Sequence, residues 1–202
     1  NTHHHWDHVG GNETLLQQYP ELQVFGHASD RERVPGLNRP LDHESRFLLG
    51  QGDQALEVRV LHNPGHTHGA ITYVVAGHAF TGDTLFGAGC GRVFEGTFAE
   101  MHHSLHQIIG TLPDSTQLYF GHEYTASNLR FAQTVEPNNK AIQDRREHSK
   151  TVGTPLALEH ATNPFLRCHL PEVKASAEQH TQASLDSPSA VFAALRQWKD
   201  NF

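Results

Sequence analysis

Four side chains near the start of the chain are of the types that bind transition metals. They are His3, His5, Asp7 and His8, in the stretch Thr2-His3-His4-His5-Trp6-Asp7-His8. Side chains two positions apart in a tight loop can converge on one ion, so His3 and His5 suit one metal, and Asp7 and His8 lie near enough to serve a second. Imidazole nitrogen favours zinc or iron, and a carboxylate oxygen can bridge two such ions. For this stretch alone, a chance cluster of surface side chains is the alternative interpretation.

Three further polar residues each follow a predicted strand and have a glycine beside them. They are His66 in Asn63-Pro64-Gly65-His66-Thr67, Asp83 in Phe80-Thr81-Gly82-Asp83-Thr84, and His122 in Phe120-Gly121-His122-Glu123. A metal site on one rim of a sheet requires strand ends that each deliver one ligand. Together with the opening motif, these residues favour a metal site over a set of unrelated polar turns.

The charge balance and the short apolar stretches of the chain argue against nucleic-acid and membrane partners. The 202 residues include 18 His, 15 Lys or Arg and 22 Asp or Glu, which gives a formal net charge of -7. This balance argues against a nucleic-acid partner. The longest apolar stretches, such as Ile71 to Ala76, are far shorter than the roughly 20 residues of a membrane span, so no membrane partner is expected. The two cysteines, Cys90 and Cys168, are too few for a disulfide framework, which favours a reducing compartment such as the cytoplasm.

The hydrophobic pattern predicts the elements that must position the metal ligands. Strands are expected at 22–25, 56–61, 71–75, 79–81 and 117–120. Helices are expected at 14–19, 98–112, 126–135, 138–150 and 189–202, and the polar stretch 28–52 is expected to be irregular. This order predicts an α/β or α+β core followed by an all-helical C-terminal part. We place the boundary so that the two units are 1–123 and 124–202.

The motifs together resemble the metallo-β-lactamase superfamily, and within it the glyoxalase II (hydroxyacylglutathione hydrolase) family. The order T-H-x-H-x-D-H, G-H-T, T-G-D-T-L-F and G-H-E-Y carries the resemblance. More specific stretches are 81–95 (TGDTLFGAGCGRVFE), 122–131 (HEYTASNLRF), 163–167 (NPFLR) and the end, 195–202 (LRQWKDNF). The resemblance implies an αββα sandwich with a helical C-terminal domain. Members of the family carry further strands before the opening motif, so this sandwich is expected to lack its first strands.

The resemblance also implies the roles of particular residues. One metal is expected on His3, His5 and His66, and the other on Asp7, His8 and His122, with Asp83 bridging. The two divalent ions are expected to be zinc, with iron or manganese as alternatives, and Asp7 and Asp83 to hold the catalytic metal-bound hydroxide. The glutathione moiety is expected to contact Arg92, Tyr124, Arg196 and Lys199, because guanidinium and ammonium groups bind its carboxylates. The chain departs from the family at Arg92, where Lys is usual, at Phe94, where Tyr is usual, and at Ala70, where His is usual.

The implied reaction is hydrolysis of S-(2-hydroxyacyl)glutathione thioesters, in which S-lactoylglutathione gives glutathione and D-lactate during methylglyoxal detoxification. Two ions lower the pKa of bound water from 15.7 to roughly 7, so hydroxide is available at neutral pH. The thiolate leaving group needs no strong acid. A dedicated nucleophilic side chain is therefore not required, and we expect Cys90 to be structural. A monomer is expected.

Two other hypotheses remain open at this point. The first is a mononuclear-iron persulfide dioxygenase on the same fold, which should not need Asp7 as a ligand or the segment that follows His122. The second is an inactive truncated fragment, because a chain without the first strands would expose an apolar sheet face.

Overall fold

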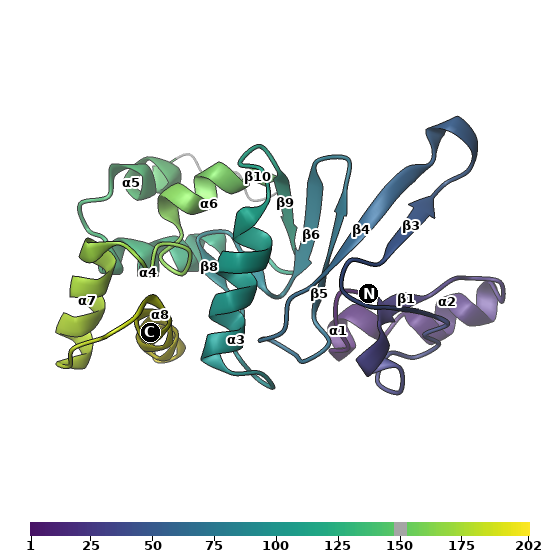
Figure 1. Cartoon of the computed structure of the whole chain (residues 1–202), viewed down its shortest axis with the longest axis horizontal. Coiled ribbons are helices and arrows are strands. Elements are labelled where there is room, and N and C mark those ends of the chain that lie inside the picture. Colours follow the sequence, from purple (N-terminus) through teal and green to yellow (C-terminus); the bar gives the residue numbers. More distant parts are fainter. Residues whose placement is uncertain (148–152) are drawn as a thin grey trace.

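Within the described residues, 1–147 and 153–202, a six-stranded mixed β-sheet lies at the centre of the computed structural model (Figure 1). Across the sheet the strands follow the order β10-β9-β6-β5-β4-β3. Their bounds are Arg46–Leu49 (β3), Leu56–His62 (β4), Ile71–Val75 (β5), His78–Gly82 (β6), Gln117–Phe120 (β9) and Thr154–Pro155 (β10).

The strand directions place three strand ends at one edge of the sheet. β3, β4, β5 and β6 are antiparallel neighbours in that order, and β6 pairs with β9 in parallel. β4, β6 and β9 therefore run in the same direction and end at the same edge. In β4, Val58 and Val60 are buried, as the period-two pattern of a strand requires.

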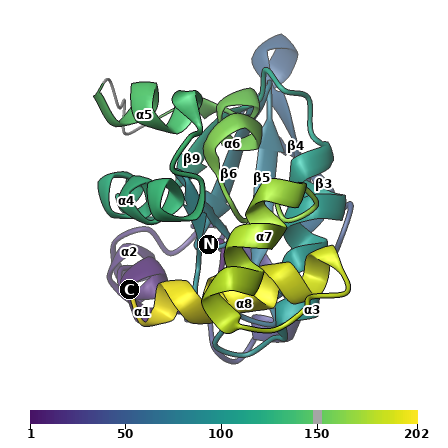
Figure 2. The same cartoon turned by 90° about the vertical axis from the view of Figure 1, so that its left-hand side faces the viewer.

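Helices lie over the sheet and beyond its β9–β10 edge (Figures 1 and 2). α3 (Phe98–His103) starts at a capping box between Thr97 and Glu100 and continues into a π turn (Ser104–Ile108) and a 3₁₀ turn (Ile109–Thr111). The C-terminal helices are α4 (Thr125–Val135), α5 (Lys140–Glu147), α6 (Leu156–Thr162), α7 (Pro171–Thr181) and α8 (Pro188–Asp200).

The first part of the chain lies beside the sheet, below β3, β4 and β5 in Figure 1. Its elements are α1 (Trp6–Val9), α2 (Asn12–Gln18), β1 (Phe25–His27), a 3₁₀ turn (Ala28–Asp30) and β2 (Arg39–Leu41). β1 and β2 pair in parallel. A further 3₁₀ turn (Gly52–Gln54) connects β3 to β4.

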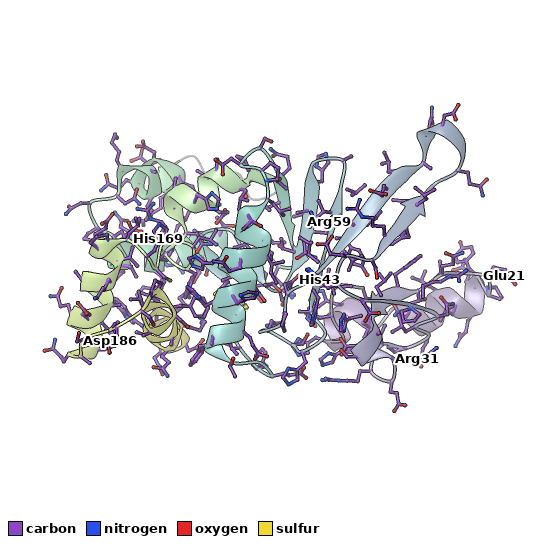
Figure 3. All side chains as sticks on the ribbon, viewed as in Figure 1. Glu21, Arg31, His43, Arg59, His169 and Asp186 are labelled. Atoms are coloured by element: carbon purple, nitrogen blue, oxygen red, sulfur yellow. The ribbon has the colours of Figure 1, made fainter. Side chains whose placement is uncertain are left out.

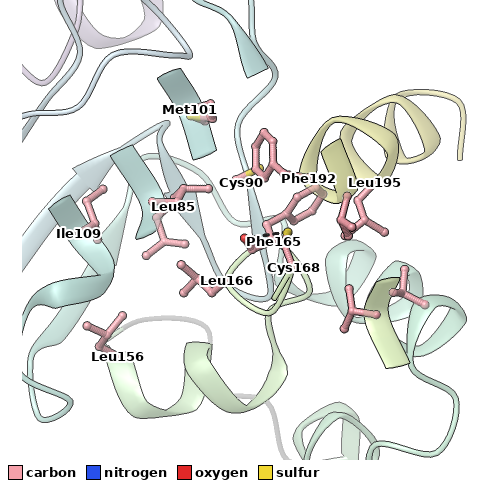
Figure 4. Packing of buried hydrophobic residues seen from close by; sticks show 14 of the residues in the cluster. Leu85, Cys90, Met101, Ile109, Leu156, Phe165, Leu166, Cys168, Phe192 and Leu195 are labelled. Atoms are coloured by element: carbon pink, nitrogen blue, oxygen red, sulfur yellow. Dashed lines mark hydrogen bonds between the residues drawn. The ribbon is translucent and has the colours of Figure 1, made fainter. Parts of the chain in front are cut away.

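One hydrophobic cluster joins the sheet, the C-terminal helices and a small hairpin made of β7 (Leu85–Phe86) and β8 (Gly89–Cys90) (Figure 4). Leu85 and Met101 pack in it together with Phe165 and Phe192, and all four are fully buried. Burial of each such side chain contributes about 1.5–3 kcal/mol. The segments 1–123 and 124–202 therefore share this core.

The sequence pattern predicts the central strands better than the peripheral elements. The predicted strands 71–75 and 117–120 match β5 and β9 in both bounds, whereas β1 begins only at the last residue of the predicted strand 22–25. The stretch 28–52, expected to be irregular, contains β2 and β3, because neighbouring Gly and Pro residues obscure their pattern. The hydrophobic pattern also does not predict α6 or α7. Gly11, and not Asn12, is the N-cap of α2. Residues 148–150 of the predicted helix 138–150 lie outside the described residues.

Apolar side chains line an open groove of about 420 Å³ between the first part of the chain and the sheet. Phe47, Leu49 and Phe80 contribute to it from β3 and β6, and Leu49 and Phe80 are exposed. None of the described helices combines the length and the apolar character needed to span a bilayer.

Candidate metal centre

The predicted ligands that follow the three aligned strands lie together at one edge of the sheet. His66 comes after β4, Asp83 after β6 and His122 after β9. The backbone N–H of Gly121 donates to the carbonyl oxygen of Gly82 over 2.9 Å, which holds the two last strand ends side by side. A Cβ atom on Gly121 would lie 2.2 Å from Oδ1 of Asp83, so glycine lets the backbone approach this carboxylate.

The opening loop is held against the same edge. The carbonyl oxygen of Thr2 accepts a hydrogen bond from the backbone N–H of Ile71 at the start of β5, over 2.9 Å. Gly82 has a φ of +52° and faces the Thr2 side chain so closely that a Cβ atom would lie 2.5 Å from Oγ1. The loop then enters α1, which carries Asp7 and His8.

His3, His5 and His66 form the first group of converging donor atoms. Nδ1 of His5 lies 3.1 Å from Nε2 of His3 and 3.1 Å from Nε2 of His66. A tetrahedral zinc ion with nitrogen ligands at about 2.0–2.1 Å separates those ligands by about 3.3 Å. The spacing of these imidazoles therefore fits one shared ion.

Asp7, His8 and His122 form the second group. Nε2 of His122 lies 3.0 Å from Oδ2 of Asp7 and 3.2 Å from Nε2 of His8. Asp83 stands between the groups: its Oδ2 is 3.4 Å from Nε2 of His122 and 3.6 Å from Nε2 of His66. Oδ1 of Asp83 is buried and lies 3.3 Å from Nε2 of His8. The structure thus brings together all the side chains that the sequence motifs predict as ligands, with Asp83 in the bridging position.

Outer contacts orient the imidazoles of the first group. Nδ1–H of His66 donates to the carbonyl oxygen of Arg92 over 2.8 Å, which leaves Nε2 with its lone pair toward the site. Oγ1 of Thr2 lies 3.2 Å from Nδ1 of His3 and fixes that ring in the same way. Backbone and hydroxyl groups therefore present the remaining nitrogen of each ring to the centre.

The environment also sets the protonation of these rings. Burial, together with the imidazoles of His8 and His66, lowers the pKa of His3 to about 2. Burial likewise lowers the pKa of His5 and of His66. These rings are neutral at neutral pH, which is the metal-binding form. The pKa of His8 is raised, mainly because its ring donates a hydrogen bond to Asp83, and a divalent ion would replace that proton.

A cavity of about 400 Å³ adjoins the centre. Its wall contains the ligands His66 and Asp83 and also the predicted glutathione contacts Arg92, Tyr124, Arg196 and Lys199. Residues that sequence reasoning did not assign also line it, and they are Phe86, Gly91, Ser127 and Asn128. They lie in the stretches 81–95 and 122–131 that carry the resemblance, but their types indicate no particular ligand. Only the fold brings the β7–β8 hairpin and the start of α4 to this site.

The four predicted glutathione contacts differ in how freely they face this cavity. Arg92 and Tyr124 are exposed, and the Tyr124 ring stacks on that of His122. Lys199 is partly buried over the rings of Phe131 and Phe202. Arg196 is buried, and its guanidinium donates to the carbonyl oxygen of Cys90 over 2.8 Å and to Asp200 over 3.0 Å.

Cys90 is buried and forms part of the cavity wall. Burial raises the pKa of its thiol to about 11, so the thiol stays protonated at neutral pH. This agrees with the structural role expected for it.

Family models divide the chain into two matched segments. Residues 1–122 match the model described as the metallo-beta-lactamase superfamily, and residues 123–202 match the model described as the hydroxyacylglutathione hydrolase C-terminus. A hydroxyacylglutathione hydrolase of Alkalilimnicola ehrlichii is 49% identical over 98% of this chain and 78% of its own length. The chain belongs to the hydroxyacylglutathione hydrolase family. A second relative of that name, from Aeromonas hydrophila, is 46% identical over 100% of this chain and 80% of its own length.

Solved structures confirm the fold expected of a hydroxyacylglutathione hydrolase family member. ETHE1 from Myxococcus xanthus superposes with a TM-score of 0.63 at 26% identity, covering 98% of this chain and 74% of that one. TTHA1623, solved in a di-iron-bound form, gives a TM-score of 0.54 at 26% identity, covering 82% and 75%. The metallo-β-lactamase fold with its helical C-terminal part is thus shown, and with it a site of the kind that holds divalent metal ions.

Other histidines of this hydroxyacylglutathione hydrolase family member lie outside the centre. His4 faces acidic side chains, with ring nitrogens 3.4 Å from Oε1 of Glu95 and 3.5 Å from Oδ2 of Asp30, and these contacts anchor the opening loop. Figure 3 shows His43 beside the sheet and His169 among the C-terminal helices. The metal centre therefore accounts for only five of the 18 histidines.

Proposed function

We propose that the protein hydrolyses S-(2-hydroxyacyl)glutathione thioesters, with S-lactoylglutathione giving glutathione and D-lactate. One observation carries the proposal: a cluster of imidazole and carboxylate donors adjoins a cavity whose wall also contains Arg92, Arg196 and Lys199. The names of the relatives that match almost the whole chain support it. The cationic side chains suit the carboxylates of a glutathione thioester, and the donor cluster suits metal ions beside its thioester group.

The donor set supports two divalent ions, one on His3, His5 and His66 and one on Asp7, His8 and His122, with Asp83 shared. Zinc is the proposed metal because imidazole nitrogen dominates the set, and iron or manganese would fit the same donors. When bound, such ions lower the pKa of a coordinated water and polarise the thioester carbonyl.

With metal bound, the carboxylates of Asp7 and Asp83 would hold the attacking water. Asp83 suits this role because its carboxylate is buried and lies between the two donor groups. Asp7 is the more exposed of the two, at the mouth of the site. The leaving thiolate has a pKa near 8.5 and needs no dedicated acid, which agrees with the protonated, enclosed state of Cys90.

The cavity wall suits the glutathione moiety. Arg92 and Lys199 offer cationic groups to its carboxylates, and Tyr124 offers a hydroxyl and an aromatic face beside His122. Arg196 adds positive charge while two of its N–H groups are used within the protein. Phe94, which stands where the family usually has Tyr, packs edge-on against His5 and His66 and brings no hydroxyl.

The geometry disfavours the mononuclear-iron dioxygenase. Asp7 lies 3.0 Å from His122, and this closeness supports a second ion held by both residues. Metal content per chain separates the two functions: close to two ions supports hydrolysis, and a single iron supports oxidation.

The experiment for the proposed function is Asp83→Ala, assayed for metal content and for hydrolysis of S-lactoylglutathione. Loss of the shared carboxylate should remove metal and lower kcat/KM by at least about a thousandfold, since the nucleophile and the carbonyl polarisation depend on both ions. Asp53→Ala, on the exposed turn before β4, is the matched control. An active, metal-free Asp83→Ala protein would overturn the proposal, and a folded, metal-loaded but inactive parent protein would support the inactive-fragment hypothesis.

We further propose that the protein acts in methylglyoxal detoxification as a cytoplasmic monomer. The two buried, free cysteines support a reducing compartment. Sedimentation of the purified protein tests the oligomeric state, and cell fractionation tests the compartment.

A further inference from the structure

The β7–β8 hairpin next to the metal centre is attached to the C-terminal helices through its backbone. Each of the successive residues Gly87, Ala88, Gly89 and Cys90 has one main-chain group bonded to a buried side chain of that part of the chain. Asn128 donates to the carbonyl oxygen of Gly87 (3.1 Å), and Glu159 accepts from the N–H of Ala88 (2.8 Å). Asn163 donates to the carbonyl oxygen of Gly89 (2.9 Å), and Arg196 donates to that of Cys90 (2.8 Å).

The backbone of the hairpin needs such support at Ala88. This residue has a φ of +54°, in the left-handed region that side chains other than glycine rarely adopt. Its two neighbours are glycines that allow close contact: a Cβ atom on Gly89 would lie 2.4 Å from Nδ2 of Asn128. A strained conformation persists when surrounding contacts hold it, and here the N–H of Ala88 donates to Glu159.

Glu159 is a fully buried carboxylate, aimed at the hairpin by its other partners. Its Oε1 accepts a hydrogen bond from Nη2 of Arg145 over 2.6 Å, and Nδ2 of Asn163 donates to Oε2 over 3.1 Å. Oε2 also accepts the N–H of Ala88. A buried ion pair contributes little to stability compared with apolar side chains of equal volume, but it fixes geometry. The pair therefore defines where the turn of the hairpin lies.

The position of the hairpin sets the position of groups in the proposed active site. The chain leaves it at Cys90 and reaches Arg92 two residues later. The carbonyl oxygen of Arg92 orients the ring of His66, and its side chain lines the cavity. Before the hairpin, Oγ1 of Thr81 donates to the oxygen of Leu85, close to Asp83. A shift of the hairpin would thus move the Arg92 side chain relative to the metal ligands.

We propose that Glu159 is a positioning residue, which holds the Ala88 turn so that Arg92 and the cavity wall align with the metal centre. Glu159 itself does not line this cavity. The effect on KM rests on the proposed hydrolase function. The effect on hydrogen exchange of the hairpin does not.

Two double variants test this role without leaving a buried charge unpaired. Both replace Arg145 by Met; one also carries Glu159→Gln, and the other carries Glu159→Leu. Replacing a buried ion pair by uncharged side chains of similar size is commonly tolerated, so both variants should fold. Glutamine still offers an oxygen to the N–H of Ala88, whereas leucine does not.

The measurements are KM and kcat for S-lactoylglutathione, metal content, thermal unfolding, and backbone hydrogen exchange of residues 85–91. With Arg145→Met/Glu159→Leu we expect unchanged metal content, a cooperative transition, faster exchange in the hairpin and a KM raised about tenfold, because small misplacements of binding groups weaken substrate binding strongly. In Arg145→Met/Glu159→Gln the hairpin should exchange slowly again, and most of the rise in KM should disappear. Glu172→Gln, at an exposed carboxylate on α7, is the control for changes in surface charge.

Equal KM and equal hairpin exchange in the two double variants would overturn the proposal. If the parent protein did not hydrolyse the thioester, the proposed function would fail, but the exchange comparison would still decide whether Glu159 holds the hairpin. If both double variants failed to fold, exchange of the Ala88 N–H in the parent protein would decide: this proton should exchange slowly because Glu159 accepts it, and exchange as fast as that of an exposed turn would contradict the proposal.

Discussion

Oδ2 of Asp7 lies 3.0 Å from Nε2 of His122, although one residue stands in the first helix and the other after the last long strand of the sheet. These two donors form one group with His8, and His3, His5 and His66 form another. This contact is the structural reason to expect two metal ions and not one.

Removal of metal should therefore inactivate and destabilise the protein together. Without an ion, the nitrogens of His3, His5 and His66 face one another at about 3.1 Å with too few protons to bond them all. An ion that binds only the folded state adds about 4 kcal/mol at a thousandfold excess over its Kd. Dialysis against a chelator should abolish thioester hydrolysis and lower the Tm, and added zinc should restore both. A chelated protein that contains no metal and keeps its activity would contradict this.

Substitution of Lys199 by Met should affect substrate binding more than turnover. The side chain keeps its length but loses the charge that faces the cavity. A group that binds the ground state and the transition state equally changes KM and leaves kcat unchanged. We expect KM for S-lactoylglutathione to rise about tenfold and kcat to stay within about twofold, measured by steady-state kinetics. Lys174→Met on α7, outside the cavity, is the matched control, and a selective loss of kcat would exclude the binding role.

Native protein should resist thiol alkylation at neutral pH. Burial raises the pKa of Cys90 to about 11 and raises that of Cys168 as well, so neither thiol is ionised. Incubation with iodoacetamide should leave the intact mass and the activity unchanged, and both thiols should react after unfolding. Alkylation of Cys90 in the folded protein with parallel loss of activity would instead support a nucleophilic role.

The stability of the protein should fall with pH through protonation of His102. Burial and the ring of His106, stacked at 4.2 Å, lower the pKa of His102 to about 4. The unfolded chain, with a histidine pKa near 6.5, binds this proton first, so the contribution is complete above about pH 6.5 and is lost as the pH falls to about 4. The free energy of unfolding in urea, measured with metal held in excess, should fall less steeply over this window in His102→Gln. Parallel curves for the two proteins would refute the assignment.

The side chains that the sequence motifs single out as ligands converge in the structure, because the ligand motifs are local. His3, His5, Asp7 and His8 sit within one loop and one short helix, and a glycine beside each later ligand marks a strand end. The strands that carry the later ligands are also predicted, since their alternating pattern reflects burial in the central sheet. The peripheral elements are predicted less well: α7 buries only Val173 and Ala177, too few apolar positions to produce a clear helical period.

The types of the functional residues, and hence the class of chemistry, follow from the sequence by itself. The tertiary structure decides which of those residues meet and what each is free to do. Sheet order places Asp83 between two donor groups, and packing of α8 on the hairpin engages Arg196 with Cys90 in the cavity wall. The same packing directs the buried Glu159 to the backbone of Ala88. These relationships depend on pairing between distant segments, which is set by the shared core and the strand register and leaves no local pattern in the chain.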